Sequence, residues 1–95
     1  MKTLVVTRHD ALVDFLLQEG LIPYDYERLE HVEEEDIRGR VVVGVLPMHL
    51  AAAASMVYVV DLDIPKEKRG MELTTEEVRM YFRGLNCYVT KKVSS

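Results

Sequence analysis

The side chains best suited to chemistry follow two short apolar segments of the chain. Thr7, Arg8 and His9 come directly after the first apolar segment, and His49 stands just after the run V-V-V-G-V-L-P-M at 41–48. An arginine can hold a phosphate through its planar fork of donors, and an imidazole can accept or release a proton near neutral pH. These residue types therefore predict a site that binds an anion and transfers a proton.

The junction at Pro47 predicts a helix N-terminus that is open to an anion. The apolar run before it indicates a buried strand, because it is continuous and too short for a helix. Pro47 suits the first turn of a helix, and the alanine-rich segment 48–54 has a high helix propensity. Leu46 cannot cap the first free N–H groups, so those donors need another partner. Leu46, Pro47 and Met48 are therefore candidate ligand-binding residues, and a neutral His49 in the first turn is a candidate general base.

Further polar residues follow the apolar segment 56–60. Asp61 and Asp63 stand at its end, and a short basic cluster ends at Arg69. The two carboxylates could close a turn or bind a hard cation. The basic cluster could be solvated or could cover a bound anion, so all three named residues are also candidates for ligand binding.

Structural roles are open for the same residues. Arg8 could pair with Asp10 on the surface, where an ion pair contributes only about 0–1 kcal/mol. His9 could simply begin a helix, and His49 could be a half-buried histidine with satisfied hydrogen bonds. The acidic run 30–36 is expected to be a solvated loop.

The order of the apolar segments predicts one small α/β domain that positions these residues. Strands alternate with helices throughout residues 1–95, which favours a three-layer, Rossmann-like fold around a mostly parallel sheet of about five strands. Ligands bind beyond the carboxyl ends of such strands, so the three groups of polar residues should meet there. The expected strands are 2–6, a weaker 26–32, 41–46, 56–60 and 86–93. Three helices are expected between them. The first is capped by Asp10 and ends at Gly20, the second covers 48–54, and the third starts at the capping box of Thr74 and Glu77 and includes Leu85.

Composition limits the classes of partner and cofactor. The formal net charge is −4 at pH 7, which disfavours binding to DNA or other long nucleic acids. No apolar run approaches the roughly 20 residues of a membrane span, and the single cysteine, Cys87, fits a reducing cytoplasm. The chain lacks a P-loop, a GxGxxG fingerprint, a CxxC pair and a GxSxG elbow, which disfavours a dinucleotide oxidoreductase, an NTPase, a zinc site and an α/β-hydrolase, and we expect no cofactor.

Four segments of the chain together resemble one protein family. They are V-T-R-H at 6–9, G-V-L-P-M-H-L-A-A at 44–52, D-L-D-I-P at 61–65 and R-G-M-E-L at 69–73. These segments are similar to landmarks of small CRISPR-associated accessory proteins found beside type III interference systems. The resemblance extends from Leu4 to about Leu85, and the G-x-L-P-x-H-L-A segment is its most specific part.

The resemblance implies a fold and an activity. Members of the family are taken to have a compact Rossmann-like fold related to the CARF sensory domain. They are grouped with ring nucleases, which degrade cyclic oligoadenylate and so end the antiviral response. For this chain the resemblance implies cyclic tetra-adenylate as the substrate. Thr7 stands where the family often has serine and keeps the hydroxyl, whereas Asp10 adds a negative charge where the family often has proline. The residues that match by position are Arg8, His9, Pro47, His49, Asp61, Asp63, Arg69 and Gly70.

The implied reaction needs no metal ion. A ribose 2′-OH of the ring attacks the adjacent phosphate, which yields linear products that end in a 2′,3′-cyclic phosphate. We expect His49 to handle the proton, Arg8 and the helix N-terminus to stabilise the developing charge, and Thr7 to orient the phosphate. A symmetric homodimer would suit a cyclic ligand with rotational symmetry.

Three other functions are open from the sequence. The chain could bind the same ring without cleaving it, as a sensor or a sponge. It could be a metal-dependent phosphoesterase that uses Asp61, Asp63 and His49. It could also be a structural interaction protein whose crevice has no ligand.

Overall fold

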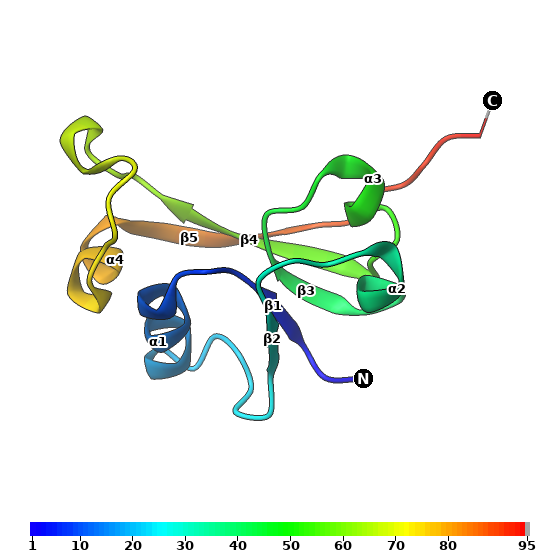
Figure 1. Ribbon diagram of the computed structural model, residues 1–95, viewed down its shortest axis with the longest axis horizontal. Coiled ribbons are helices and arrows are strands. Elements are labelled where there is room, and N and C mark those ends of the chain that lie inside the picture. Colours follow the sequence, from blue (N-terminus) through cyan, green and yellow to red (C-terminus); the bar gives the residue numbers. More distant parts are fainter. Residues whose placement is uncertain (95) are drawn as a thin grey trace.

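A five-stranded β-sheet forms the middle layer of the protein (Figure 1). The computed structural model describes residues 1–94. The strands lie in the order β2-β1-β3-β4-β5, in which β1 to β4 run parallel and β5 runs antiparallel to β4. The predicted α/β fold with a mostly parallel sheet is therefore confirmed. The strands are β1 (Leu4–Val6), β2 (Glu27–Leu29), β3 (Val41–Gly44), β4 (Met56–Leu62) and β5 (Phe82–Tyr88), and the helical elements are α1 (Asp10–Gln18), α2 (Glu34–Ile37), α3 (Met48–Ala51), the 3-10 turn η1 (Lys66–Lys68) and α4 (Thr75–Tyr81).

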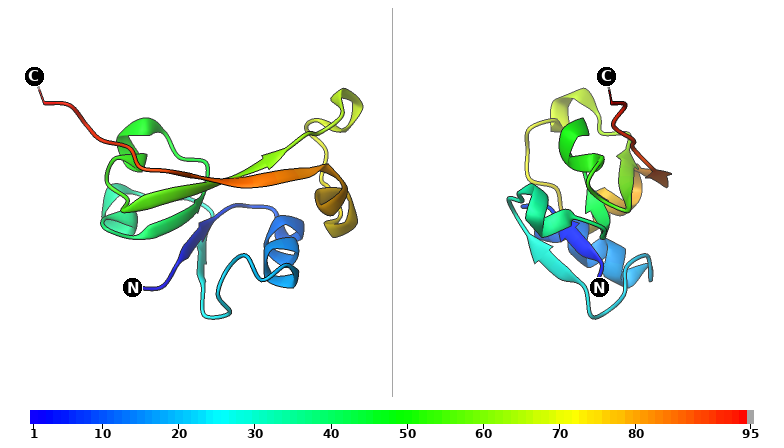
Figure 2. Two further views of the ribbon diagram at one scale, coloured as in Figure 1. Left: turned by 180° about the vertical axis from the view of Figure 1, so that it is seen from behind. Right: turned by 90° about the vertical axis from the view of Figure 1, so that its right-hand side faces the viewer.

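Helices cover both faces of the sheet and bury one apolar cluster on each. Successive strand residues point to opposite faces, so Val5 and Val43 pack against α1 and α4, whereas Leu4 and Val42 pack with residues of α2 and α3. Figure 2 shows α1 and α4 together at one end of the sheet, with α2 and α3 at the other end. The chain thus forms three layers, as predicted.

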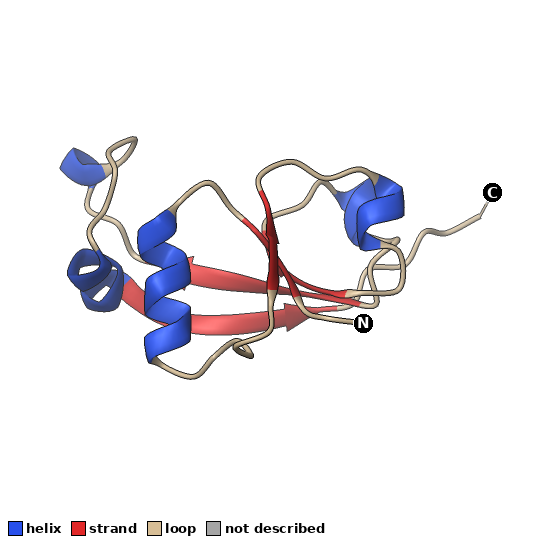
Figure 3. Cartoon of the chain, turned by 60° about the horizontal axis from the view of Figure 1, so that its bottom comes forward, coloured by secondary structure: helices blue, strands red, loops and turns tan. Residues whose placement is uncertain are grey.

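The strands β4 and β5 extend beyond the rest of the sheet. β4 pairs with β3 only over Met56–Tyr58, and its second half, Val59–Leu62, pairs with β5 alone. In this register Gly44, the last residue of β3, lies level with Val59. The end of β4 therefore lies on the order of 10 Å farther along, at about 3.3 Å per residue. Figure 3 shows the long β4–β5 pair reaching past the shorter strands, so the carboxyl end of the sheet is stepped.

The last helix is shorter than the sequence predicts. It was expected to include Leu85, but α4 ends at Tyr81 and β5 begins at Phe82, where the backbone is extended with φ −63° and ψ 128°. Phe82 nevertheless packs on Phe15 of α1, with ring centroids 4.9 Å apart. The helix-like spacing of Phe82 in the sequence therefore reflects burial of its side chain from a strand, β5, that pairs with β4. For the same reason β4 continues to Leu62 instead of ending at residue 60.

Two other helical segments also differ from the prediction. The helix expected at 48–54 has only the single turn of α3, because hydrogen bonds from Gly39 to Ala53 and from Ser55 to Arg40 draw the following residues toward β3. The acidic run is not a loop throughout, since it contains most of α2. There Glu33 and Asp36 form a capping box at the helix N-terminus, where carboxylates are favourable.

Two helix ends that were predicted from a capping box and a glycine are confirmed. Thr74 Oγ1 accepts a hydrogen bond from the Glu77 N–H, and a Glu77 carboxylate oxygen accepts one from the Thr74 N–H, both at 3.1 Å. Gly20, with φ +67°, ends α1. Of the helices within residues 1–94, none is long and apolar enough to cross a membrane.

Candidate functional site

One pocket lies where β1 and β3 end, and we call it the strand-end pocket. Its volume is about 430 Å³, and its lining comes from these two strand ends, the start of α1, Glu30 and the overhanging half of β4. β1 continues into α1 on one face, whereas β3 continues into α3 on the other face. The pocket thus occupies a topological switch point, the position where α/β sheets commonly bind ligands.

Gly44 allows the two strand ends to approach closely. It lies opposite Val6, has φ +152°, and a Cβ at this position would be 2.6 Å from the Val6 carbonyl oxygen. A side chain here would push the strand ends apart. The glycine of the G-V-L-P-M-H-L-A-A segment is therefore explained by the geometry of the sheet.

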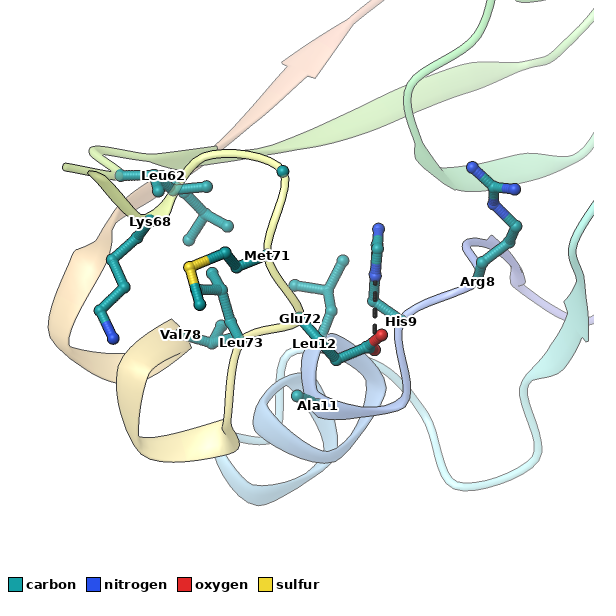
Figure 4. Close-up of a pocket in the computed structure, with 12 residues that line it drawn as sticks. Arg8, His9, Ala11, Leu12, Leu62, Lys68, Met71, Glu72, Leu73 and Val78 are labelled. Carbon is teal, nitrogen blue, oxygen red and sulfur yellow. Dashed lines mark ion pairs between the residues drawn. The ribbon is translucent and has the colours of Figure 1, made fainter. Parts of the chain in front are cut away.

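A second pocket adjoins the first, and we call it the loop pocket. Its volume is about 420 Å³, and it lies between the start of α1, the end of β4 and the loop 69–73 (Figure 4). Arg8, His9, Leu12 and Leu62 line both pockets. The two pockets together form a groove along the carboxyl end of the sheet, with Arg8 and His9 at its centre.

Arg8 has an exposed side chain that is free to hold an anion. Among residues 1–94 it makes no hydrogen bond and no ion pair, and in Figure 4 its guanidinium points away from the apolar residues of the loop pocket. The alternative pairing with Asp10 is wrong, because Asp10 pairs with Arg28 instead, at 2.6 Å. Asp10 is also not the cap of α1, which has His9 as its N-cap and no side-chain cap hydrogen bond.

Thr7 and His9 are held in a fixed turn beside Arg8. Thr7 Oγ1 accepts a hydrogen bond from the His9 N–H at 3.1 Å, and the Thr7 carbonyl accepts one from Arg28 Nε at 3.3 Å. The hydroxyl hydrogen of Thr7 can still be donated to a ligand. His9 Nδ1 lies 3.7 Å from a carboxylate oxygen of Glu72, which is an ion pair only when the imidazole is protonated and is too long for a hydrogen bond. His9 thus connects the start of α1 with the loop 69–73.

His49 lies outside the groove. α3 is a single turn, in which the Pro47 carbonyl accepts hydrogen bonds from Leu50 and Ala51, while the N–H groups of Met48 and His49 have no partner within residues 1–94. The open N–H groups predicted at this junction are therefore present. However, α3 packs with the cluster on the face opposite to α1, and His49 lines neither pocket. Leu46, Pro47 and Met48 also lie outside both pockets, so the predicted convergence with Arg8 is not formed within this chain.

Asp61 and Asp63 lie outside both pockets that Arg8 lines. Asp61 lies inside β4 on the same side as Val57 and Val59, which face α2 and α3. The Asp63 carboxylate accepts a hydrogen bond from Arg83 at 3.1 Å. In the part of the chain that the structure describes, no three His, Cys, Asp or Glu side chains are grouped as metal ligands. The hypothetical cation site of Asp61, Asp63 and His49 is therefore not formed.

Some residues of the loop pocket were not predicted as site residues from the sequence. The loop 69–73 contributes Met71, Glu72 and the predicted Gly70, whereas the exposed Arg69 lies beside the pocket without lining it. The only sequence signal for Met71 and Glu72 was their place within the R-G-M-E-L segment. Their position against α1 follows from the overhang of β4, which the sequence does not reveal.

An ion pair holds the base of this loop to α4. Lys68 Nζ lies 3.0 Å from a Glu77 carboxylate oxygen. The Thr74 N–H and the Lys68 ammonium stabilise the carboxylate and lower the pKa of Glu77 below its ordinary value. The hydrogen bond to Glu77 raises the pKa of Lys68 above its ordinary value. Lys68 therefore supports the loop and is less available than Arg8 for a bound anion.

Comparisons with known proteins identify a family. The family model described as "Putative CRISPR-associated protein (Cas_VVA1548)" matches residues 4–91, which include every lining residue of both pockets. Comparison with curated proteins and with solved structures gives no match.

Proposed function

The chain belongs to this CRISPR-associated family, and on that premise we propose that it is a ring nuclease that cleaves cyclic oligoadenylate without a metal ion. Cyclic tetra-adenylate is the expected substrate. Cleavage would remove the second messenger and switch off type III CRISPR signalling.

The observation that supports this proposal is the unpaired Arg8 at the end of β1. Arg8 and Thr7 both line the strand-end pocket at the switch point of the sheet. Arg28 neutralises the nearby Asp10, so this carboxylate does not cancel the local positive charge. A phosphate diester is a ligand that an arginine fork and a hydroxyl donor recognise well. Local attraction is needed because the whole chain carries a formal charge of −4.

The proposed reaction breaks one phosphodiester bond. The 2′-oxygen attacks the adjacent phosphorus, the bond from phosphorus to the 5′-oxygen breaks, and the products are a 2′,3′-cyclic phosphate and a 5′-hydroxyl. The proton of the 2′-hydroxyl leaves to a base, and the 5′-oxygen gains a proton. Arg8 stabilises the additional negative charge on the phosphate, and Thr7 orients it.

Two imidazoles are candidates for the proton transfer. The sequence pointed to His49, whereas His9 lies in the groove with Arg8. We propose His9 as the group that acts within one chain. His49 would require a contact from a second chain, which a symmetric homodimer around the ring could supply.

Incubation of cyclic tetra-adenylate with excess protein in EDTA, followed by chromatography, tests the activity. We expect linear products with a 2′,3′-cyclic phosphate. An intact ring that co-elutes with the protein would instead indicate a binding module, and cleavage only after Mg²⁺ or Mn²⁺ is added would indicate a metal-dependent phosphoesterase. An intact ring that does not bind refutes both nucleotide functions.

Matched variants test the residues. Arg8→Ala should weaken binding of the ring roughly 10- to 100-fold, because a charge-assisted hydrogen bond is lost. Arg38→Ala is the control, since Arg38 is also an exposed arginine and pairs with Glu34 away from the groove. His9→Ala should lower the rate of cleavage roughly 100- to 10,000-fold with little change in binding. If His49→Ala has that effect instead, His49 carries the proton, and if neither variant does, the acid–base mechanism is wrong.

A further inference from the structure

The loop pocket has a chemistry that phosphate binding alone does not explain. Its wall is apolar and comes from four elements, whereas its charged groups stand at its edges. A volume of about 420 Å³ lies within the range of small-molecule sites. The larger apolar residues of this wall are Leu12, Leu62, Ile64, Met71, Leu73 and Val78.

We propose that the loop pocket is the base subsite of the protein and takes an adenine of the ligand. This inference rests on the proposed function, which supplies the nucleotide. Arg8 lines the loop pocket as well as the strand-end pocket. A nucleotide fits this arrangement, because its ribose would connect a base in the loop pocket to a phosphate at Arg8.

Glu72 provides a polar contact that selects the base. Its carboxylate has only His9 as a partner within residues 1–94, and their distance of 3.7 Å leaves the carboxylate oxygens available. In Figure 4 the two side chains stand together at the edge of the apolar wall that is nearer to Arg8, while Lys68 lies at the far side. A carboxylate accepts a hydrogen bond from the exocyclic amino group of adenine, and uracil has no such group.

Met71 provides an adaptable cover for the base. Met71 is 58% exposed, and its side chain lies between Leu62, Leu73 and Val78 in Figure 4. A thioether is flexible and makes favourable contacts with aromatic rings. Gly70, with φ +81°, lets the loop turn so that Met71 lies over the pocket. The loop thus supplies both a wall and a hydrogen-bond acceptor for one planar ring.

Methyl NMR of the full chain tests the subsite with defined probes. Adenosine 5′-monophosphate should shift the methyl signals of Met71 and Ile64 in a saturable way, whereas ribose 5-phosphate should not. Met80 is an internal control, because it is exposed on α4 and lines neither pocket. If the adenosine nucleotide moves Met71 and Ile64 no more than Met80, the proposal is overturned.

A pair of variants tests the role of Glu72. Adenosine 5′-monophosphate should bind roughly tenfold more tightly than purine riboside 5′-monophosphate, which has the same rings without the amino group. Glu72→Ala should abolish this preference, and Glu76→Ala, which changes an exposed carboxylate of α4 outside the pocket, should retain it. A preference that survives in Glu72→Ala, or that is absent from the unmodified protein, refutes the contact.

The outcomes separate this inference from the proposed function. Cleavage of cyclic tetra-adenylate without any response of Met71 and Ile64 to that ring or to the mononucleotide would refute the base subsite alone. A saturable response of Met71 to the mononucleotide, with no binding or cleavage of the ring, would refute the ring nuclease and leave a nucleotide-binding pocket.

Discussion

Replacing Gly44 with alanine tests whether the strand-end pocket depends on the close approach of β1 and β3. The added Cβ would lie 2.6 Å from the Val6 carbonyl oxygen and 3.2 Å from the Val6 Cβ, at a φ of +152° that alanine rarely adopts. Backbone strain of this kind costs about 1–3 kcal/mol, and overpacking costs about another 1–3 kcal/mol. We therefore expect Gly44→Ala to lower the free energy of unfolding by about 2–6 kcal/mol.

Urea denaturation of matched glycine variants measures the two contributions. Gly39→Ala isolates the strain, because Gly39 has φ +69° and a Cβ there would meet nothing within 4 Å. It should cost only about 1–2 kcal/mol. Gly84→Ala has neither strain nor a close neighbour, and its change should stay within about 0.5 kcal/mol. If Gly44→Ala costs no more than Gly39→Ala, the argument for a close strand contact is wrong.

Two further predictions concern the base of the loop pocket and the core. Because the Thr74 N–H and Lys68 lower the pKa of Glu77, the stability that this group contributes is present above about pH 4.5 and is lost as the pH falls through the lower pKa of the folded state. The unfolding free energy of Glu77→Gln should therefore decline less on acidification than that of the unmodified protein. Urea denaturation across pH 3 to 7, roughly the titration range of carboxylates, measures this decline. An unchanged decline would contradict the prediction. Phe15→Ala removes a ring that is 2% exposed and packs on Phe82, so unfolding free energy should fall by about 3–5 kcal/mol. A loss below about 1 kcal/mol in the same assay would show that this contact is not central to the core.

The sheet could be predicted from the sequence because its strands have a strong local signal. The run 41–44 combines three β-branched residues with a buried centre at Val42 and Val43, which favours a central parallel strand. The boundary at Phe82 could not be predicted in this way. The spacing of Val78, Phe82 and Leu85 fits one face of a helix, but pairing of Phe82 with Leu62 in β4 outweighs that local preference.

The candidate site was predicted only where it follows a strand directly. Thr7, Arg8 and His9 lie at the end of β1 as expected, because a strand end fixes the residues that follow it. His49 depends on which face α3 covers, and no local pattern in the sequence contains that information. The loop pocket was missed for a similar reason, since the fold brings its walls together from four separate elements.

The stepped end of the sheet has a consequence for how far a ligand must reach. Arg8 follows the short strand β1, whereas Leu62, at the end of the longer β4, stands on the order of 10 Å beyond the level where β3 ends, at about 3.3 Å per residue. A molecule that engages both levels must be elongated and rigid enough to bridge them. The stepped end of the sheet would thus discriminate between ligands by their length and shape. Compact anions that are abundant in a cell would compete poorly for the groove.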